Sequence, residues 1–395
     1  MNVAILTREY PPDVYGGAGV HVEYLARELA RLTHVTVHCW GADRPQTDPP
    51  VVAYRAWTEL SNAALQAISI DLAMAQRVDG ASLVHSHTWY ANLGGHLAKL
   101  MHGIPHVATV HSLEPMRPWK AEQLGGGYAV STFCERTGLE NADAVIAVSH
   151  EHRGDLLAAY PAVDPERVTV IYNGIDTDEY KPDRRVDVLE RHGVDPSRPS
   201  VVFVGRITRQ KGVGHLLDAA LRFDPRAQLV LCAGAPDTSE IAAEIEAKVE
   251  RLRSERGDVV WIEQMLPKPE VIQLLSHATV FVCPSIYEPL GIVNLEAMAC
   301  EAAVVATQTG GIPEVVEDGV TGLLVPFEPR DDGSREPVDA DRFAADIAGC
   351  VNELLADPAS AERFGKAGRR RAIERFGWPA VAAETLALYQ RLTTR

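Results

Sequence analysis

Short apolar runs alternate with stretches of helix length through most of this chain. A strand in a parallel sheet is a nearly continuous apolar run, because helices cover both faces of the sheet. Such runs, each separated by a helical stretch, predict right-handed βαβ units. The predicted strands are residues 3–6, 34–39, 81–85, 106–110, 144–148 and 168–171, and then 201–204, 228–233, 259–262, 279–282 and 304–306.

The length of the chain indicates two domains. Its 395 residues exceed one ordinary domain and suit two domains of roughly 150–200 residues each. An Asn-Gly turn, acidic residues and a proline follow residues 168–171 and predict a linker near 174–184. The predicted fold class is therefore α/β, with two Rossmann-like, doubly wound parallel-sheet domains.

Composition argues against several classes of protein. A formal net charge of −16 argues against a nucleic-acid partner. Six scattered cysteines without a C-x-x-C pair favour buried thiols in a reducing compartment over disulfides or a zinc site. The start MNVAILTREY is not signal-like, and no apolar run approaches membrane-spanning length. We therefore expect a cytoplasmic protein without a membrane partner.

A glycine loop follows the first predicted strand and contains Gly16, Gly17 and Gly19. A glycine turn that opens a helix presents backbone amides and the positive end of the helix dipole to an anion. A tight turn without any ligand explains the same residues equally well. The spacing is not G-x-G-x-x-G, because Val22 stands at the last position, and this argues against an NAD-dependent dehydrogenase.

Two cations follow the first predicted strand of the second half. Arg206 ends the strand in the segment GRITRQKG, and Lys211 precedes the next helix. Both are expected at the carboxyl edge of the sheet, where they can hold the two phosphates of a diphosphate together with loop amides. Surface charges beside a turn are the alternative interpretation.

Residues 282–299 carry two carboxylates in the pattern EPLGIVNLE. Glu288 lies in the loop after a predicted strand, and Glu296 lies on the second turn of the following helix. Gly291 lets backbone approach a ligand at the start of that helix. The two acids can contact different hydroxyl groups of one polar ligand, so the arrangement favours a sugar-nucleotide site over a solvated turn.

Histidines end two predicted strands. His85 and His87 are two residues apart, so they share one side of a strand, as metal ligands can. No third ligand follows from spacing, and metal is therefore the less favoured interpretation. His111 ends a buried strand where a parallel sheet binds its ligands.

A long loop interrupted by proline and glycine follows His111 and contains Arg117, Lys120 and Arg136. Long ordered loops in α/β proteins are usually functional. These cations can hold an anionic acceptor such as a sugar phosphate. Solvated charges on a surface excursion are the equally weighted alternative.

The segments EPLGIVNLE, GRITRQKG and HSLEPMRPWKAEQLGGGY together resemble retaining glycosyltransferases of the GT-B fold, in the group that includes bacterial glycogen synthases. The last segment is most similar to actinobacterial members. The resemblance implies two domains facing a deep cleft and a C-terminal helix that crosses back to the first domain. It implies an acceptor domain at 1–175 with 376–395, and a donor domain at 176–375.

The resemblance also implies individual roles. In the family, Glu288 matches the acid that contacts the transferred sugar, Glu296 the acid that holds the ribose, and His111 the histidine near the sugar 6-hydroxyl. The implied donor-binding residues are Gly16, Gly17, Gly19, Arg206, Lys211, Met265, Leu266, Glu288, Leu290, Gly291, Ile292 and Glu296. The implied catalytic residues are Arg206, Lys211, Glu288 and His111.

The implied activity is a retaining hexosyl transfer from ADP-glucose in glycogen biosynthesis, without a metal or a cofactor. The expected acceptor is α-D-glucose 1-phosphate, giving α-maltose 1-phosphate, because of the cations in the long loop. The end of a glycogen chain is the alternative acceptor, and we expect a homodimer. A glycoside hydrolase leaves Arg206 and Lys211 unexplained. A non-catalytic nucleotide-sugar binding protein remains an alternative, and the nucleotide base is open.

Overall fold

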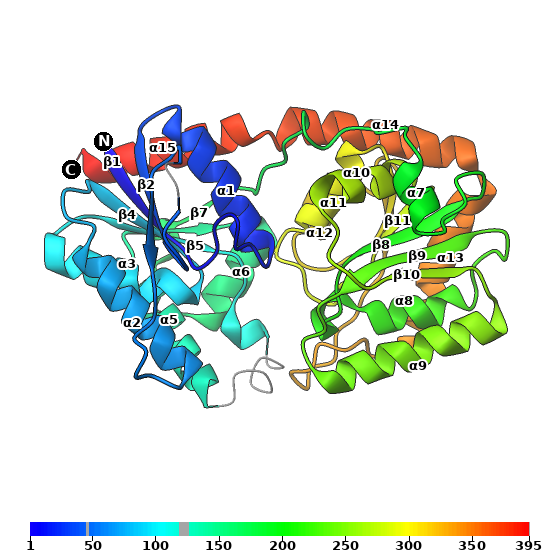
Figure 1. Ribbon diagram of the computed structural model, residues 1–395, viewed down its shortest axis with the longest axis horizontal. Coiled ribbons are helices and arrows are strands. Elements are labelled where there is room, and N and C mark those ends of the chain that lie inside the picture. Colours follow the sequence, from blue (N-terminus) through cyan, green and yellow to red (C-terminus); the bar gives the residue numbers. More distant parts are fainter. Residues whose placement is uncertain (45–46, 118–125, 395) are drawn as a thin grey trace. The chain divides into compact units, whose positions relative to one another are not determined.

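The computed structural model describes residues 1–44, 47–117 and 126–394. The chain forms two compact units. The first contains Met1–Gly174 and Trp378–Arg395, and the second contains Ile175–Gly377. Each unit is a parallel sheet with helices on its faces (Figure 1). The expected α/β class with two Rossmann-like sheets is confirmed.

The first unit holds a seven-stranded sheet with the order β3-β2-β1-β4-β5-β6-β7. The chain builds outward from β1 in one direction and from β4 in the other, so the direction of winding reverses between these two strands. The strands are β1 (Asn2–Leu6), β2 (His34–Trp40), β3 (Val51–Tyr54), β4 (Leu83–His87), β5 (His106–Val110), β6 (Ala144–Ala147) and β7 (Val168–Val170). The helices are α1 (Gly17–Ala30), α2 (Ala63–Gln76), α3 (Trp89–His102), α5 (Gly127–Asn141), α6 (His150–Ala159) and α15 (Trp378–Thr393), with short η1 (Glu114–Met116) and η2 (Pro165–Arg167).

The second unit holds a six-stranded sheet with the order β10-β9-β8-β11-β12-β13, in which the winding reverses between β8 and β11. Its strands are β8 (Ser200–Arg206), β9 (Gln228–Gly234), β10 (Val259–Ile262), β11 (Val280–Cys283), β12 (Ala303–Thr307) and β13 (Gly322–Val325). Its helices are α7 (Asp187–Arg191), α8 (Val213–Ala220), α9 (Ser239–Glu255), α10 (Lys268–Ser276), α11 (Ile292–Ala299), α12 (Ile312–Val315), α13 (Ala340–Ala356) and α14 (Pro358–Arg375), with short η3 (Arg209–Lys211).

The two reversal points matter because open α/β sheets bind ligands beyond the carboxyl ends of the strands at such points. In the first unit, the glycine loop follows β1 and two histidines end β4. In the second unit, Arg206 ends β8, and the loop containing Glu288 follows β11. These predicted site residues therefore lie at the reversal points of their own sheets.

The last helix packs in the first unit, beside α1 (Figure 1). The indole of Trp378 stacks on Tyr24 of α1 with ring centroids 5.5 Å apart. Further along α15, the Tyr389 hydroxyl lies 2.5 Å from Nδ1 of His85 in β4. The expected return of the C-terminal helix to the first domain is confirmed.

The backbone at Gly174 comes very close to this helix. A Cβ added to Gly174 would lie 2.5 Å from Cδ2 of Trp378, which is closer than real Cβ contacts allow. Glycine is therefore required here by the approach of the indole.

All six cysteines are unpaired, and five of them are buried, as expected from their scatter. Within the described part of the chain, no helix combines the length and the apolar character that a membrane crossing requires.

Candidate functional site

Lys211 and Glu288 form a buried ion pair in the second unit. The Lys211 Nζ lies 2.5 Å from Glu288 Oε2, and the Ser285 hydroxyl donates to the same oxygen at 3.3 Å. Burial alone would lower the pKa of the Lys211 ammonium, but the Glu288 carboxylate outweighs burial and keeps this pKa above its ordinary value. The structure thus brings together two predicted site residues that are 77 positions apart.

The backbone around this pair is tightly fitted. Gly212 has a φ of 62°, and a Cβ at this position would collide with the carbonyl oxygen of Pro284. The Ile286 amide donates to the carbonyl of Gln210 at 3.0 Å. Backbone contacts therefore join the loop after β8 to the loop after β11. These contacts hold the side chains of Lys211 and Glu288 close to each other.

Arg206 has an acidic partner that the sequence analysis missed. Its Nη1 lies 3.3 Å from Oδ1 of Asp237, which follows β9. The guanidinium is therefore oriented by a carboxylate at the end of β8. Asp237 follows the neighbouring strand, so only the order of the strands identifies it as a partner.

Glu296 is also held by a residue that the sequence analysis missed. The Tyr180 hydroxyl donates to its Oε1 at 3.1 Å. Burial raises the pKa of the Glu296 carboxyl to about 7, although the hydrogen bond from Tyr180 partly offsets this effect. Near neutral pH the group therefore divides between its ionised and protonated forms, and only the ionised form is purely an acceptor for ligand hydroxyls.

One glycine within the turn between the two acids and two glycines after β12 shape the backbone around Glu288. Gly291 lies in the left-handed region at φ 96° and precedes α11. The Gly311 amide donates to the Glu288 carbonyl at 2.9 Å, and a Cβ at Gly310 would collide with this same oxygen. Leu290 is buried beneath the turn and Ile292 is half-buried. The backbone of Glu288 is thus positioned by its neighbours.

The residues predicted to contact a nucleobase follow β10, at the edge of the second sheet. Met265 exposes 66% of its surface, whereas Leu266 is half-buried. Their strand is separated from β8 by β9 alone, and all three strands are parallel. The pair therefore lies on the same carboxyl edge as Arg206, away from the core.

In the first unit, the glycine loop folds around an internal carboxylate. Oε2 of Glu9 accepts hydrogen bonds from the amides of Tyr15 and Gly16 at 2.8 and 2.7 Å. A Cβ at Gly19 would lie 2.8 Å from that oxygen. The sequence analysis proposed these amides for an anionic ligand and missed Glu9. In the first turn of α1, the amides of Gly19 and Val20 donate to the Gly16 carbonyl at 3.1 and 3.3 Å. The amides of Gly17 and Ala18 precede the first intrahelical bond, as in any helix.

Histidines converge at the reversal point of the first sheet. His85 is fully hydrogen-bonded, through Nδ1 to Tyr389 and through Nε2 to Thr109. Nδ1 of His87 lies 3.0 Å from Nε2 of His111. His21 of α1, which the sequence analysis did not consider, packs on the rings of His87 and His111.

Burial determines the charge of these rings. It lowers the pKa of His85, His87 and His111 well below the ordinary value, and it lowers the pKa of His21 to about 4. The rings are therefore uncharged at neutral pH. A neutral imidazole at His111 can donate to or accept from a sugar hydroxyl, which is the contact predicted for it.

The predicted acceptor cations have different environments. Arg117 is largely buried, donates to the Ser112 hydroxyl at 2.8 Å and lies 3.8 Å from Glu114. Arg136 is exposed on α5, and Lys120 lies outside the described residues. Of the two cations that the structure describes, only Arg117 is fixed in place by neighbouring groups.

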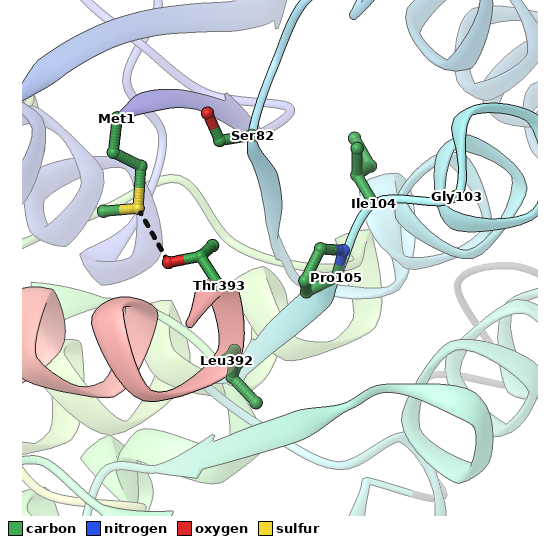
Figure 2. Close-up of a pocket in the computed structure, with 7 residues that line it drawn as sticks. All are labelled: Met1, Ser82, Gly103, Ile104, Pro105, Leu392 and Thr393. Carbon is green, nitrogen blue, oxygen red and sulfur yellow. Dashed lines mark hydrogen bonds between the residues drawn. The ribbon is translucent and has the colours of Figure 1, made fainter. Parts of the chain in front are cut away.

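A separate pocket of about 450 Å³ lies at the amino ends of the strands of the first sheet (Figure 2). It is lined by Met1, Ser82, Gly103, Ile104, Pro105, Leu392 and Thr393. These residues precede β1, β4 and β5 or end α15, so the pocket is remote from the carboxyl ends of the strands. It contains none of the predicted site residues.

Solved structures and family comparisons define the class of this protein. Sucrose-phosphate synthase from Thermosynechococcus elongatus matches with a TM-score of 0.79 and 25% identity, covering 100% of this chain and 99% of that chain. The catalytic domain of starch synthase IV from Arabidopsis thaliana, solved with ADP and acarbose, matches with a TM-score of 0.76 and 17% identity, covering 100% and 99%. Residues 15–179 match Glycosyltransferase Family 4, and residues 187–371 match Glycosyl transferases group 1. The protein is an enzyme, a glycosyltransferase of the GT-B fold.

A relative of known name shows which glycosyltransferases this chain is closely similar to in sequence. The α-maltose-1-phosphate synthase of Mycolicibacterium smegmatis is 55% identical over 397 aligned positions, which cover 100% of both chains. The chain belongs to the glycosyltransferase family of the mycobacterial α-maltose-1-phosphate synthases. The resemblance found in the sequence motifs is confirmed.

Proposed function

We propose that this enzyme transfers glucose from ADP-glucose to α-D-glucose 1-phosphate and releases α-maltose 1-phosphate and ADP. The observation that carries the proposal is the 55% identity over the full length to α-maltose-1-phosphate synthase. The resemblance of the sequence motifs to glycogen synthases supports adenine as the base.

The proposed donor contacts lie at the reversal point of the second sheet. Arg206 and Lys211 bind the diphosphate. Glu296, which Tyr180 holds in place, accepts a hydrogen bond from a ribose hydroxyl. Lys211 already carries a full charge because of Glu288. When the diphosphate binds, Lys211 turns part of its hydrogen bonding from the carboxylate to phosphate, and Glu288 gains freedom to contact the sugar.

The proposed chemistry depends on leaving-group stabilisation. The bond between the anomeric carbon and the diphosphate oxygen breaks, and negative charge grows on ADP. Preorganised cations at this position lower the barrier without any reorganisation, which is commonly the largest catalytic term. The 4-hydroxyl of the acceptor attacks the same face of the oxocarbenium-like ion, its proton passes to the departing phosphate, and the α configuration is retained.

The proposed contacts of the first unit are His111 with the donor sugar and Arg117 with the acceptor phosphate. Arg117 supports a phosphate contact because its guanidinium is held by Ser112 and Glu114 rather than by solvent alone. Lys120 and Arg136 complete the proposed acceptor set. The amides from Gly17 onward are proposed to contact the donor diphosphate.

The deciding experiment supplies the enzyme with ADP-glucose and either α-glucose 1-phosphate or glycogen, and measures kcat/KM for ADP release. We expect a clear preference for α-glucose 1-phosphate. A preference for glycogen would identify a chain-elongating glycogen synthase instead. ADP-glucose that binds but is never consumed with either acceptor would identify a binding protein. UDP- and GDP-glucose in parallel reactions test the base.

We further propose a cytoplasmic location and a homodimer. Unpaired cysteines support a reducing compartment. Analytical ultracentrifugation of the purified chain tests the dimer, which a single monomeric species would exclude.

A further inference from the structure

Three histidine side chains meet in the first unit from three different elements. His21 lies on α1, His87 ends β4, and His111 follows β5. One ring nitrogen from each lies within 4.8 Å of the corresponding nitrogens of the other two. The sequence analysis considered His85 with His87, and the fold instead brings His21 and His111 to His87.

Part of this group has unused hydrogen-bonding capacity. Neither ring nitrogen of His21 has a partner with good hydrogen-bond geometry among the described residues, although the Asn173 side chain lies near the ring. Nε2 of His87 also has no partner there, and it is not the nitrogen that faces His111. His21 is 3% exposed and His87 is fully buried. A buried polar atom without a partner costs free energy, so such atoms usually have a ligand, an ion or a water against them. His85, the nearest other histidine, is excluded because both of its nitrogens are bonded.

The spacing between two of the rings suits a metal. Nδ1 of His87 and Nε2 of His111 are 3.0 Å apart. Two nitrogens bound to one tetrahedral zinc at about 2.0–2.1 Å are separated by about 3.4 Å. A shift of a few tenths of an ångström therefore converts this contact into a pair of metal ligands, and a rotation of His21 completes a set of three.

We infer that His21, His87 and His111 form a binding site for one divalent transition-metal ion of the zinc type. Three neutral imidazoles with no carboxylate or thiolate select zinc, copper or nickel over magnesium or calcium, which prefer oxygen ligands. Three histidine ligands leave a fourth position for water or a small ligand. The proposed transfer reaction requires no metal, and it shares only His111 with this site.

A consequence for activity rests on the proposed function. If His111 contacts the donor sugar, a metal held by His111 competes with that contact. Zinc should then inhibit glucose transfer, and a chelator should restore it. Metal binding itself is measured without any substrate. A failure of the metal site is therefore distinguishable from a failure of the proposed transferase function.

The test uses the full chain and Co²⁺ as a spectroscopic substitute for Zn²⁺. We expect one Co²⁺ per chain with the visible absorption of a four-coordinate site and no thiolate charge-transfer band. Zn²⁺ should displace it, and isothermal titration should give the same stoichiometry for zinc. Absence of stoichiometric binding by the wild-type chain overturns the inference.

Matched variants locate the site. His21→Gln and His87→Gln should each weaken zinc binding by about 100-fold or more, since even second-shell changes cost 10–100-fold. His34→Gln, at an exposed position on β2, and Cys350→Ser should bind as the wild type does. Circular dichroism shows whether each variant is folded. If the histidine variants do not fold, the cobalt spectrum of the wild-type chain alone decides whether the metal site exists. Unchanged binding in folded histidine variants, or loss of binding in Cys350→Ser, contradicts the assignment.

Discussion

Replacing Lys211 by methionine tests two roles of the Lys211–Glu288 pair, in the stability of the fold and in catalysis. The substitution removes the charge but keeps most of the aliphatic volume. Both side chains are mostly buried, at 21% and 10% exposure, so Glu288 loses its partner away from solvent. Breaking a buried pair costs about 3–5 kcal/mol. We expect the free energy of unfolding to fall by about 3 kcal/mol, the lower end of this range, because the Ser285 hydroxyl still donates to Glu288.

The same substitution should also reduce kcat, through a separate loss of leaving-group stabilisation. Loss of one preorganised stabilising group typically lowers kcat by about 10²–10³-fold. Lys211 is proposed to act on charge that develops on the departing diphosphate, so the loss should fall on kcat with KM for ADP-glucose changed less. The assays are steady-state ADP release with ADP-glucose and α-glucose 1-phosphate, and urea unfolding followed by circular dichroism.

A double substitution then distinguishes stability from catalysis. Lys211→Met with Glu288→Gln removes both charges, and its unfolding free energy should return to within about 1 kcal/mol of wild type. Its kcat should stay low. Lys248→Met is the control, because Lys248 forms a 2.5 Å pair with Asp218 on the same unit and neither residue is a predicted site residue. Near-normal turnover of Lys211→Met, or recovery of turnover in the double variant, would refute the proposed role.

Two further predictions follow from single residues. The folded-state pKa of Glu296 is raised by burial to about 7 from 4.5, so this group contributes stability below pH 4.5 that is lost as the pH rises through 7. Glu296→Gln should therefore remove a pH dependence of about 3 kcal/mol from the unfolding free energy between these values, and flat wild-type stability over this range would contradict it. Donor affinity, measured by titration with ADP-glucose, should rise with pH through 7 in the wild type, because only ionised Glu296 is a full acceptor. Gly174→Ala should lose about 1–3 kcal/mol by displacing Trp378, whereas Gly349→Ala on α13, with nothing within 4 Å, should be neutral or slightly stabilising in thermal unfolding.

Much of the fold follows from local pattern. Strands such as Val280–Cys283 are buried on both faces, so they are apolar throughout and easily recognised. The short strands β3 and β13 were missed; both are sheet edges, and half of their residues or more are only partly buried. Their membership depends on pairing with a neighbour and not on their own composition.

The sequence by itself determined which residues are predicted for the site, since Arg206, Lys211, Glu288 and Glu296 stand in recognisable local patterns. The tertiary structure alone decided their partners. Asp237, Tyr180, Glu9 and His21 carry no local signal, because a side-chain contact depends on the order of strands in the sheet and on which helix covers it. An ion pair across 77 positions, or three imidazoles from a helix and two strand ends, exists only once the chain has folded.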